Sequence, residues 1–416
     1  MRSKPLSTVF PNYGHGCFAD LPNLIQSCLT DHPAPTDLTG IPEGLLHQYD
    51  NVILLLIDAF GWQLFQRFAE RHPFLQQLTQ EATVARWTSQ FPSTTAAHVT
   101  CIHSGLPPVQ SGVFEWEYYE PMVDATITPL LFSYGGRLLR DALRTTGVQA
   151  AQLYPAQSLH QQLRALGVET HVFQHREYTP STYTDWICRG AEMHPYATLA
   201  EAFFNLRQTV RRAAKPAYYF LYFDKIDTLS HAYGPESPQV EAEVEAFLFL
   251  LEKALLQPGR QEFNKTLLLL TADHGQMPVN PRTTIFLNRD PRFAGLERYL
   301  RRNEQGNLID PAGSPRDYFL YIHDDQLDEA QDFLAERLDG IADTRLVQPM
   351  IDEGYFGPLP PSPEFLARVG NLVILPHEEQ TVWWYEEGRF GMHHYGLHGG
   401  LSAQEMEIPL CLLEFD

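Results

Sequence analysis

The stretch Leu267-Leu268-Leu269-Leu270-Thr271-Ala272-Asp273-His274-Gly275 decides the fold class of this 416-residue chain. Four consecutive leucines are typical of a short strand that is buried on both faces, as strands of parallel sheets are. In open α/β sheets, ligands bind outside the carboxyl ends of the strands. We therefore expect Asp273 and His274 to lie where such a protein carries its functional site. A turn aspartate beside a hydrogen-bonded histidine is the alternative interpretation.

The composition favours a large folded protein whose substrate or partner is not a polyanion. With 44% hydrophobic residues, the chain can bury a large core, either as one domain with insertions or as two domains. The formal net charge is -21, from 51 acidic and 30 basic side chains, which argues against duplex nucleic acid or an anionic membrane as a partner. If the substrate is itself anionic, bound divalent cations would reverse the local charge.

The cysteines and the amino terminus indicate the compartment. The five cysteines are scattered without CxxC spacing, so neither a disulfide framework nor a thiolate zinc site is expected. Residues 1–5 lead to no apolar signal segment, and no stretch approaches the roughly 18 apolar residues of a membrane span. We therefore expect a soluble cytoplasmic protein, whose oligomeric state leaves no trace in the sequence.

Apolar runs and helical periodicity alternate along the chain. Strands are predicted at residues 52–57, 218–223, 267–270, 372–375 and 409–413. Helices are predicted at residues 62–80, 136–144 and 239–256, the last of them ended by Pro258-Gly259. This alternation predicts an α/β fold with a mostly parallel central sheet and helices on both faces.

Residues 278–389 differ from the rest in being richer in Arg, Pro and charged side chains. They carry a strand-helix pattern of their own at 318–322 and 327–338, which predicts a small α/β cap inserted into a core of residues 1–277 and 390–416. The run Pro358-Leu359-Pro360-Pro361-Ser362-Pro363 is typical of a stiff connector. Ordinary excursions of a single domain are the alternative.

Two further segments place carboxylates and imidazoles at metal-binding spacing. Asp58 follows the apolar run of residues 51–57 directly, although it would serve equally as the cap of a helix that begins near Trp62. Asp227 and His231 stand four residues apart, so one helical turn would let both side chains meet one ion. Asp224 lies close by and would support a ligand rather than be one.

A late segment adds a third source of imidazoles. Glycines around His398 allow the backbone to bring its side chain into a crowded site, and His393 and His394 are further candidates in the same loop. Three aspartates and three histidines supply the oxygen and nitrogen ligands that suit two divalent ions, zinc or manganese. Two such ions clamp the attacking and leaving oxygens in phosphoryl transfer.

The segment Phe91-Pro92-Ser93-Thr94-Thr95 offers hydroxyl groups at the start of a predicted helix that Gly105 ends. Helix capping alone would account for them. The same position faces free backbone N–H groups and the positive end of the helix dipole, which together form a phosphate site. A metal-activated threonine there would attack phosphorus.

In this order the motifs resemble those of the alkaline phosphatase superfamily, and most closely its nucleotide pyrophosphatase/phosphodiesterase branch. The likeness spans residues 50–413 and rests on Leu56-Ile57-Asp58, the Ser-Thr-Thr segment, the nine residues from Asp227 to Pro235, and Thr271-Ala272-Asp273-His274-Gly275. It implies an alkaline phosphatase-like core and hydrolysis of a small phosphodiester or nucleotide pyrophosphate through a covalent phospho-threonine intermediate.

The resemblance also implies the ligands of two divalent ions, zinc before manganese. One ion would be held by Asp227, His231 and His398, and would neutralise the leaving oxygen. The other would be held by Asp58, Asp273, His274 and the oxygen of the nucleophile, which it activates. The nucleophile is assigned to Thr95, ten residues before Gly105, with Thr94 as the alternative.

One segment departs from the branch. The Asn that usually follows the nucleophile helix is absent from Ser111-Gly112-Val113-Phe114-Glu115-Trp116-Glu117, so the third phosphoryl oxygen has no assigned partner. Apart from Lys225 the motifs carry no cation, which favours a diester over a monoester. Trp116, Tyr118 and Tyr119 would line the pocket for a leaving group or pack in the core.

Three alternatives follow from the same residues. A phosphomonoesterase or a phosphomutase of the superfamily would use the same ligands, and a metal-stabilised binding protein would use them without turnover. A sulfatase is disfavoured because Cys101 is followed by Ile102-His103-Ser104 rather than by the Cys-x-Pro-x-Arg pattern.

Overall fold

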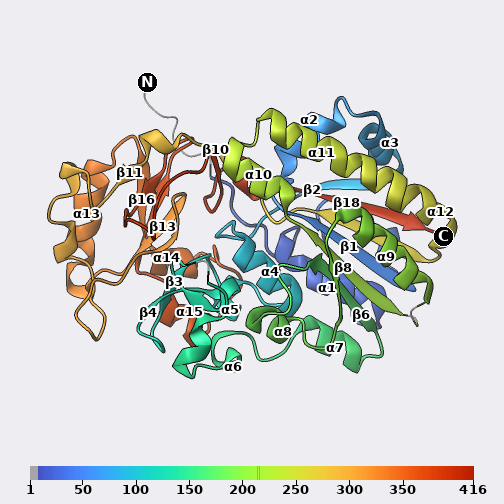
Figure 1. Cartoon of the computed structure of the whole chain (residues 1–416), viewed down its shortest axis with the longest axis horizontal. Coiled ribbons are helices and arrows are strands. Elements are labelled where there is room, and N and C mark those ends of the chain that lie inside the picture. Colours follow the sequence, from blue (N-terminus) through green and yellow to red (C-terminus); the bar gives the residue numbers. More distant parts are fainter. Residues whose placement is uncertain (1–7, 138, 213, 215) are drawn as a thin grey trace.

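The computed structural model describes residues 8–137, 139–212, 214 and 216–416 (Figure 1). Its largest sheet has seven strands in the order β2-β18-β9-β1-β8-β6-β7. These strands are β1 (Asn51–Ile57), β2 (Thr83–Thr88), β6 (Glu169–His175), β7 (Glu192–Tyr196), β8 (Ala217–Phe223), β9 (Thr266–Thr271) and β18 (Glu407–Phe415). Strands β9, β1, β8, β6 and β7 run parallel, whereas β18 pairs antiparallel with both of its neighbours. The predicted mostly parallel central sheet is confirmed.

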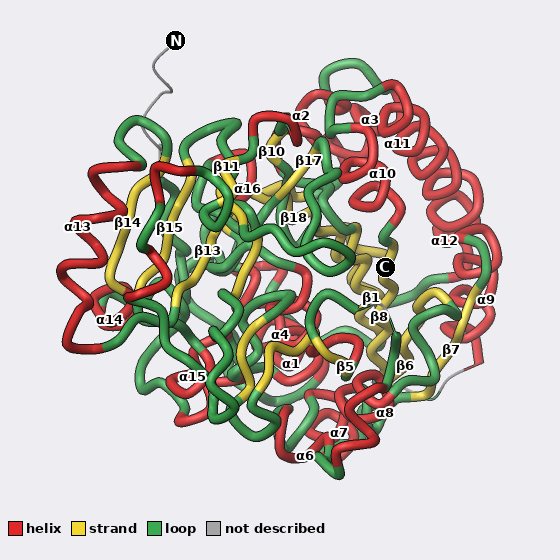
Figure 2. The backbone as a smooth tube through the Cα atoms, turned by 60° about the vertical axis from the view of Figure 1, so that its left-hand side comes forward, coloured by secondary structure: helices red, strands yellow, loops and turns green. Residues whose placement is uncertain are grey.

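The leucine-rich stretch forms β9, between β1 and β18. Every residue of β1 and β9 is buried, because helices cover both faces of the sheet (Figure 2). One face carries α1 (Leu21–Leu29), α4 (Thr95–Ser104) and α7 (Leu159–Ala165), and the other carries α2 (Trp62–Ala69), α3 (Pro73–Glu81), α9 (Leu199–Arg212) and α11 (Pro238–Leu250). Burial on both sides explains why these strands are continuous apolar runs rather than alternating ones.

Two helix predictions need correction. Residues 62–80 form two helices rather than one, because Pro73 begins α3 and His72 caps it by accepting a hydrogen bond from Leu75 N at 3.4 Å. Around residues 136–144 the described part of the chain, which leaves out residue 138, forms turns and the 3-10 helix Ala142–Thr146. Gly136 and Asp141 have φ angles of 68° and 64°, and an α-helix excludes that left-handed conformation.

The helix predicted at residues 239–256 does not end at Pro258. After α11 it continues as a π-helix (Leu251–Leu256) and then as α12 (Gln257–Glu262). Proline has no N–H for the carbonyl four residues earlier. That carbonyl, of Ala254, accepts a hydrogen bond from Arg207 Nη1 at 3.2 Å instead. A tertiary contact therefore satisfies the group that the proline leaves unpaired.

A second, four-stranded antiparallel sheet lies at the opposite end of the molecule, in the order β12-β13-β15-β14 (Figure 1). Its strands are β12 (Ala312–Ser314), β13 (Asp317–Leu320), β14 (Ala342–Leu346) and β15 (Leu372–Pro376). A strand, a helix and a strand were predicted at residues 318–322, 327–338 and 372–375. The structure forms β13, α13 (Leu327–Arg337) and β15 in these places. The extent of the cap, residues 278–389, stays a prediction.

The small sheet has two different faces. Tyr318 and Leu320 of β13 pack with α13 in a separate hydrophobic cluster. Phe319, between them, belongs to the main core. The residues before Ser362 in the proline-rich run form irregular backbone, and Ser362 caps the helix Pro363–Arg368 by accepting from Phe365 N at 3.1 Å. Since adjacent residues of a strand point to opposite faces, one sheet connects the two clusters.

Candidate active site

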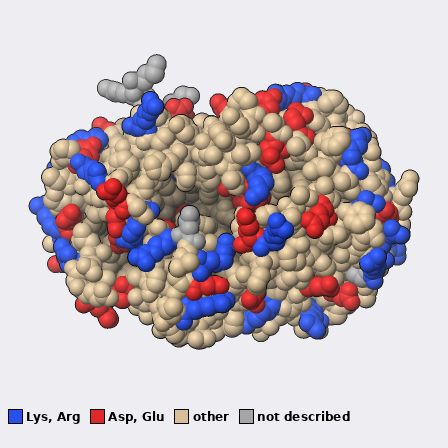
Figure 3. All heavy atoms as spheres, in the orientation of Figure 1, with Lys and Arg blue, Asp and Glu red and all other residues tan. Residues whose placement is uncertain are grey.

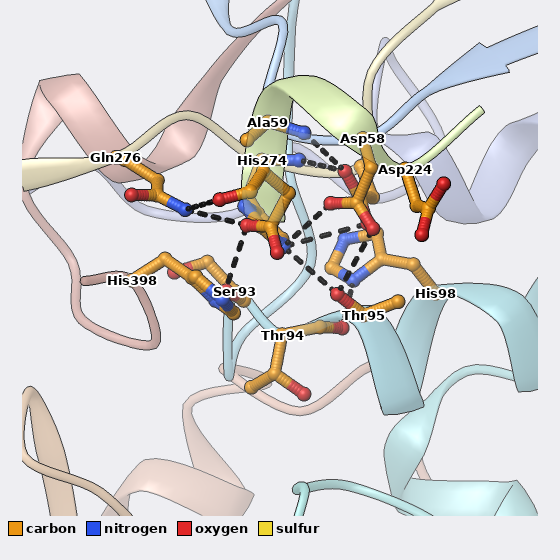
Figure 4. A network of polar contacts seen from close by, with 12 residues as sticks. Asp58, Ala59, Ser93, Thr94, Thr95, His98, Asp224, His274, Gln276 and His398 are labelled. Carbon is orange, nitrogen blue, oxygen red and sulfur yellow. Dashed lines mark hydrogen bonds and ion pairs between the residues drawn. The ribbon is translucent and has the colours of Figure 1, made fainter. Parts of the chain in front are cut away.

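The predicted site residues converge at one edge of the large sheet (Figure 4). Asp58 follows β1, and Asp273 and His274 follow β9. The helix α10 (Lys225–Tyr233), which follows β8, carries Asp227 in its first turn. Since β8, β1 and β9 are adjacent parallel strands, their carboxyl ends meet at this edge. Thr95 reaches the edge as the first residue of α4.

His274 lies at the centre of the first group of candidate ligands. Its Nε2 is 3.5 Å from Asp58 Oδ1, 3.4 Å from Asp273 Oδ2 and 3.2 Å from Thr95 Oγ1. The ligand atoms of Asp58, Asp273 and His274 all lie within 4.8 Å of one another, and all three side chains are buried. These three residues were predicted to share one ion.

A second group contains Asp227, His274 and His398, again within 4.8 Å of one another. His398 Nε2 is 3.7 Å from Asp227 Oδ1, and His231 Nε2 is 3.4 Å from Asp227 Oδ2. His231 thus lies beside Asp227, as the four-residue spacing predicts. The group of three whose ligand atoms all lie within 4.8 Å of one another, however, contains His274 and not His231. The rings of His274 and His398 stack with 3.6 Å between their centroids. The structure therefore brings all six predicted ligands and Thr95 together.

The three histidines share one orientation. Nδ1 of His231 is 2.7 Å from the Gly396 carbonyl oxygen, and Nδ1 of His398 is 2.9 Å from the Ser93 carbonyl oxygen. Nδ1 of His274 is 3.1 Å from its neighbour's carbonyl oxygen. A carbonyl only accepts, so each Nδ1 carries the proton and each Nε2 presents a lone pair toward the carboxylates. Metal-ligating histidines are oriented in the same way.

The carboxylates are oriented as well. Asp273 Oδ1 accepts hydrogen bonds from Ala59 N at 3.2 Å and from His274 N at 3.0 Å. Ala59 has a φ angle of 60°, an uncommon conformation for a residue with a side chain, which directs its N–H to the carboxylate. Among the described residues, Asp58 Oδ1 and Asp273 Oδ2 are buried without a hydrogen-bond partner. Unpaired carboxylate oxygens of this kind are expected where a cation binds.

The electrostatics fit divalent cations. Burial, and then repulsion from Asp273, raises the pKa of Asp58 and of Asp227 well above the usual range. Burial lowers the pKa of His231 to about 4 and that of His398 well below its ordinary value. Three carboxylates crowded among neutral imidazoles need positive charge to ionise together. The donor set of carboxylate oxygens and imidazole nitrogens suits zinc or manganese.

Of the two candidate nucleophiles, Thr95 faces the ligand groups. Its hydroxyl donates toward Asp58 Oδ2, 3.5 Å away. Thr94 is the cap residue of α4, and its Oγ1 is buried and makes no hydrogen bond within the described chain. Gly105 ends the helix as predicted, with a φ angle of 79°. Ser93 instead contacts the loop that carries His398.

Sequence reasoning missed several residues that contact the predicted ligands. The hydroxyl of Tyr222 donates to Asp58 Oδ2, and Gln276 Nε2 donates to Asp227 Oδ1. Ser89 Oγ donates to the backbone carbonyl of Asp273 at 2.7 Å, and lies 2.8 Å from His98 Nε2. Tyr222 is the last residue but one of the predicted strand 218–223, so its place near the end of that strand was the available signal.

The other sequence candidates lie further from the ligand groups. Asp224 accepts a hydrogen bond from the Tyr178 hydroxyl and pairs with Lys225 Nζ at 3.1 Å, rather than with a predicted ligand. His394 is exposed, and its ring centroid lies 4.7 Å from that of His231. His393 is exposed in the same loop.

A cavity of about 200 Å³ opens from the ligand groups, and the face shown in Figure 3 is hollowed in its middle. Trp116 lines this cavity, whereas Tyr118 stacks on Phe114 in the core. The Tyr119 hydroxyl donates to Asp124 Oδ1 at 2.6 Å. Only Trp116 of the three predicted aromatic residues thus contributes to the cavity wall, and the glutamates on either side of it do not line the cavity.

Within the described ranges, no helix combines the length and the apolar character needed to cross a membrane. The five cysteines are all free and buried.

The chain resembles known proteins in sequence and in fold. A family model described as type I phosphodiesterase / nucleotide pyrophosphatase matches residues 52–399. No curated protein matches the sequence. The structure is similar to murine ectonucleotide pyrophosphatase/phosphodiesterase 5, with a TM-score of 0.61, 17% identity, and coverage of 86% of this chain and 87% of that one.

Two further structures are similar. An inactive variant of the same murine protein in complex with AMP has a TM-score of 0.62 at 16% identity, covering 87% of each chain. Phosphonoacetate hydrolase from Sinorhizobium meliloti 1021, in complex with phosphonoacetate, has a TM-score of 0.60 at 17% identity, covering 89% of this chain and 91% of that one. The predicted resemblance to the alkaline phosphatase superfamily and the predicted fold class are confirmed.

Proposed function

The chain belongs to the type I phosphodiesterase / nucleotide pyrophosphatase family and is a phosphoric ester hydrolase, and from that premise we propose that it cleaves small phosphodiesters or nucleotide pyrophosphates with two divalent metal ions and a covalent phospho-threonine intermediate. The proposal replaces the alternative of a binding protein without turnover. A phosphomonoesterase or a phosphomutase remains the competing activity.

One observation carries the proposal. Thr95 Oγ1 lies 3.2 Å from His274 Nε2 and 3.5 Å from Asp58 Oδ2, at the amino terminus of a buried helix and beside both groups of candidate ligands. A nucleophile needs such a position, since the helix end and the ligand groups both favour a phosphoryl group in front of it. A metal-binding protein without turnover would have no use for it.

The proposed ligands follow the resemblance. Asp58, Asp273 and His274 would hold one ion, and Asp227, His231 and His398 the other, with zinc as the expected metal and manganese as the alternative. When bound, these cations would lower the pKa of the Thr95 hydroxyl and neutralise charge on the phosphoryl group. The unpaired oxygens of Asp58 and Asp273 and the outward Nε2 lone pairs support this assignment.

The chain's own groups account for the chemistry around phosphorus. Thr95 Oγ1 loses its proton to solvent and forms a bond to phosphorus as the bond to the leaving oxygen breaks in line, and the leaving oxygen takes up a proton from solvent. Water then attacks phosphorus and breaks the bond to Oγ1, which restores the threonine hydroxyl and releases the phosphate product. Before attack, the hydroxyl donates toward Asp58 Oδ2, which keeps a lone pair of Oγ1 directed at the cavity. The Tyr222 hydroxyl holds Asp58, and Gln276 holds Asp227, in the orientations that this reaction needs.

A diester is the proposed substrate class rather than a monoester. Among the described residues that line the cavity, Arg140 is the only Lys or Arg. A monoester dianion would require more positive charge than a diester monoanion. We propose a cytoplasmic location, which the free and buried cysteines support, and a small phosphate ester or nucleotide rather than a nucleic-acid duplex as the substrate.

The test compares a 4-nitrophenyl phosphodiester with 4-nitrophenyl phosphate on the metal-loaded chain. We expect faster release from the diester, loss of the rate on chelation, and recovery on addition of zinc. Thr95→Ala should bind metal and lose turnover, while Thr94→Ala, as the matched control, should keep it. An active Thr95→Ala variant, or a higher rate on the monoester, would contradict the proposal.

A further inference from the structure

The cavity follows one face of α4 away from the ligand groups. Thr95, Val99 and His103 all line it, and their four-residue spacing places them on the same face of the helix. Eight residues of α-helix span about 12 Å. The cavity therefore continues from the proposed nucleophile to a far end that is two helical turns deeper.

The wall between the two ends is mostly apolar, with Val99, Leu131, Ile187 and Phe220 among its lining residues. The charged lining residues are those of the ligand groups, together with Asp224 beside Asp58 (Figure 4) and the half-buried Arg140. An apolar wall without a buried counter-charge excludes a group that is charged at its far end.

The far end carries a pair of buried histidines. His103 Nδ1 lies 2.9 Å from His160 Nε2, and the ring of His103 packs edge-on against Phe220. Burial lowers the pKa of both imidazoles, that of His160 to about 3, so both rings are neutral. Each neutral ring carries one proton, and the contact between the rings uses His103 Nδ1 and His160 Nε2, which leaves His103 Nε2 and His160 Nδ1 for other contacts.

The position of the protons decides what the cavity offers. His160 Nδ1 is buried without a hydrogen bond within the described residues. A buried N–H without an acceptor is rarer in proteins than a buried acceptor without a donor. His160 therefore donates from Nε2 to His103 Nδ1, and the remaining proton of His103 lies on Nε2. His103 lines the cavity, so this N–H is a hydrogen-bond donor at the far end.

Resting on the hydrolysis of phosphodiesters proposed above, we propose that the cavity along α4 binds the organic group of the substrate, and that His103 selects an uncharged, mainly apolar group with a hydrogen-bond acceptor at its far end. His103 is then a specificity-determining residue, and His160 positions it. An acceptor such as a carbonyl oxygen would satisfy a donor that is otherwise unpaired in an apolar environment.

His103, His160 and Cys188 also place three possible metal ligands within 4.8 Å of one another. Burial raises the pKa of the Cys188 thiol strongly, which opposes the thiolate that a metal requires. The hydrogen bond between the two imidazoles already uses the facing nitrogens. The recognition of an organic group is therefore the better use of these side chains.

The experiment measures kcat/KM for 4-nitrophenyl phosphodiesters whose second ester group is a phenyl or a biphenyl that carries either an acetyl or an isopropyl substituent. The two substituents have nearly the same shape, but only acetyl accepts a hydrogen bond. For whichever of the two groups, phenyl or biphenyl, is long enough to reach His103, we expect kcat/KM of the acetyl compound to exceed that of the isopropyl compound about three- to tenfold. This factor corresponds to the net free energy of one hydrogen bond. Equal rates at both lengths would overturn the inference.

His103→Phe keeps a ring of similar size and removes the donor, so the ratio of acetyl to isopropyl rates should fall to about one. His171→Phe, a buried histidine of β6 outside the cavity, is the matched control and should keep the wild-type ratio. An unchanged ratio in His103→Phe overturns the inference. Circular dichroism and thermal melting establish that each variant is folded.

Cys188→Phe provides an independent variant, because the added ring would fill the far end of the cavity. The ratio of biphenyl-diester to methyl-diester rates should fall at least tenfold, and an unchanged ratio would count against binding of the organic group in the cavity.

If wild-type protein hydrolyses none of the diesters, the proposed function fails as well as the inference on the cavity. If it hydrolyses all of them equally, only the inference on the cavity fails. A third equivalent of bound metal that disappears in Cys188→Phe would overturn the role given to His103.

Discussion

The imidazole of His398 is held by the backbone of Ser93, since its Nδ1 lies 2.9 Å from the Ser93 carbonyl oxygen. The Ser93 hydroxyl accepts from Gly399 N at 3.1 Å and donates to the Gly400 carbonyl at 2.8 Å. Ser93 stands two residues before Thr95. One residue therefore sets the position of a proposed metal ligand relative to the proposed nucleophile.

Ser93→Ala should weaken metal binding and not abolish it. The variant keeps the carbonyl that contacts His398 but loses both hydrogen bonds of the hydroxyl to the loop. Substitution of residues that orient metal ligands costs about ten- to a hundredfold in affinity, and we expect the lower end. Competition with a chelator measures it. The control is Thr94→Val, because the Thr94 hydroxyl makes no hydrogen bond to any described residue; equal losses in both variants would contradict the prediction.

Arg316→Met should destabilise the fold by about 3–5 kcal/mol, because it leaves a buried carboxylate unpaired. Arg316 Nε and Nη2 each lie 3.0 Å from an oxygen of Glu405, and both side chains are fully buried. Glu405 also accepts from Gly400 N at 3.0 Å, so the pair connects the small sheet to the loop of His398. Urea unfolding measures the loss.

Two comparisons make the Arg316 prediction specific. The double variant Arg316→Met, Glu405→Leu removes the unpaired charge and should recover part of the lost stability. Arg292→Ala breaks an exposed pair with Asp290 and should cost less than about 1 kcal/mol. If the buried and the exposed pair cost the same, the buried pair does not have the assigned role.

His160→Leu should change how stability depends on pH. Burial lowers the pKa of His160 to about 3 in the folded chain, against about 6.5 when unfolded. Below pH 6.5 the unfolded chain therefore binds a proton that the folded chain does not, and the free energy of unfolding of the wild type decreases as the pH is lowered. From pH 7 to pH 5 the leucine variant should lose about 2 kcal/mol less than wild type.

Urea unfolding of both proteins at the two pH values checks this prediction. His32→Leu, at an exposed position, is the control and should change both measurements alike. A loss from pH 7 to pH 5 that is the same in His160→Leu and in wild type would show that His160 is not coupled to folding.

The sequence predicted the residues of the site more accurately than it predicted the bounds of the helices. Asp58 and Asp273 could be located because each directly follows an apolar strand, and parallel strands end at a common edge. The spacing of Asp227 and His231 likewise encoded a contact within one helical turn. Such relationships depend on local sequence and on the topology of the sheet alone, and the structure brings these residues together.

Contacts between distant segments could not be predicted in this way. Tyr222 and Gln276 are ordinary residues in the sequence, and only the three-dimensional arrangement places them against Asp58 and Asp227. The prediction that the helix over residues 239–256 ends at Pro258-Gly259 was wrong for the same reason, since Arg207 supplies the missing hydrogen bond from another helix. Local propensity is a weak guide wherever a tertiary contact compensates for it.

The place of β18 in the sheet has a consequence for how the protein is made. Among the strands of the described chain, β18 is the one that pairs with β2, and one edge of β9 stays unpaired until β18 is added. A ribosome therefore has to release residues 407–415 before the sheet can close. Until then the nascent chain exposes the leucine-rich edge of β9, a template for wrong pairing that a holding chaperone would have to cover.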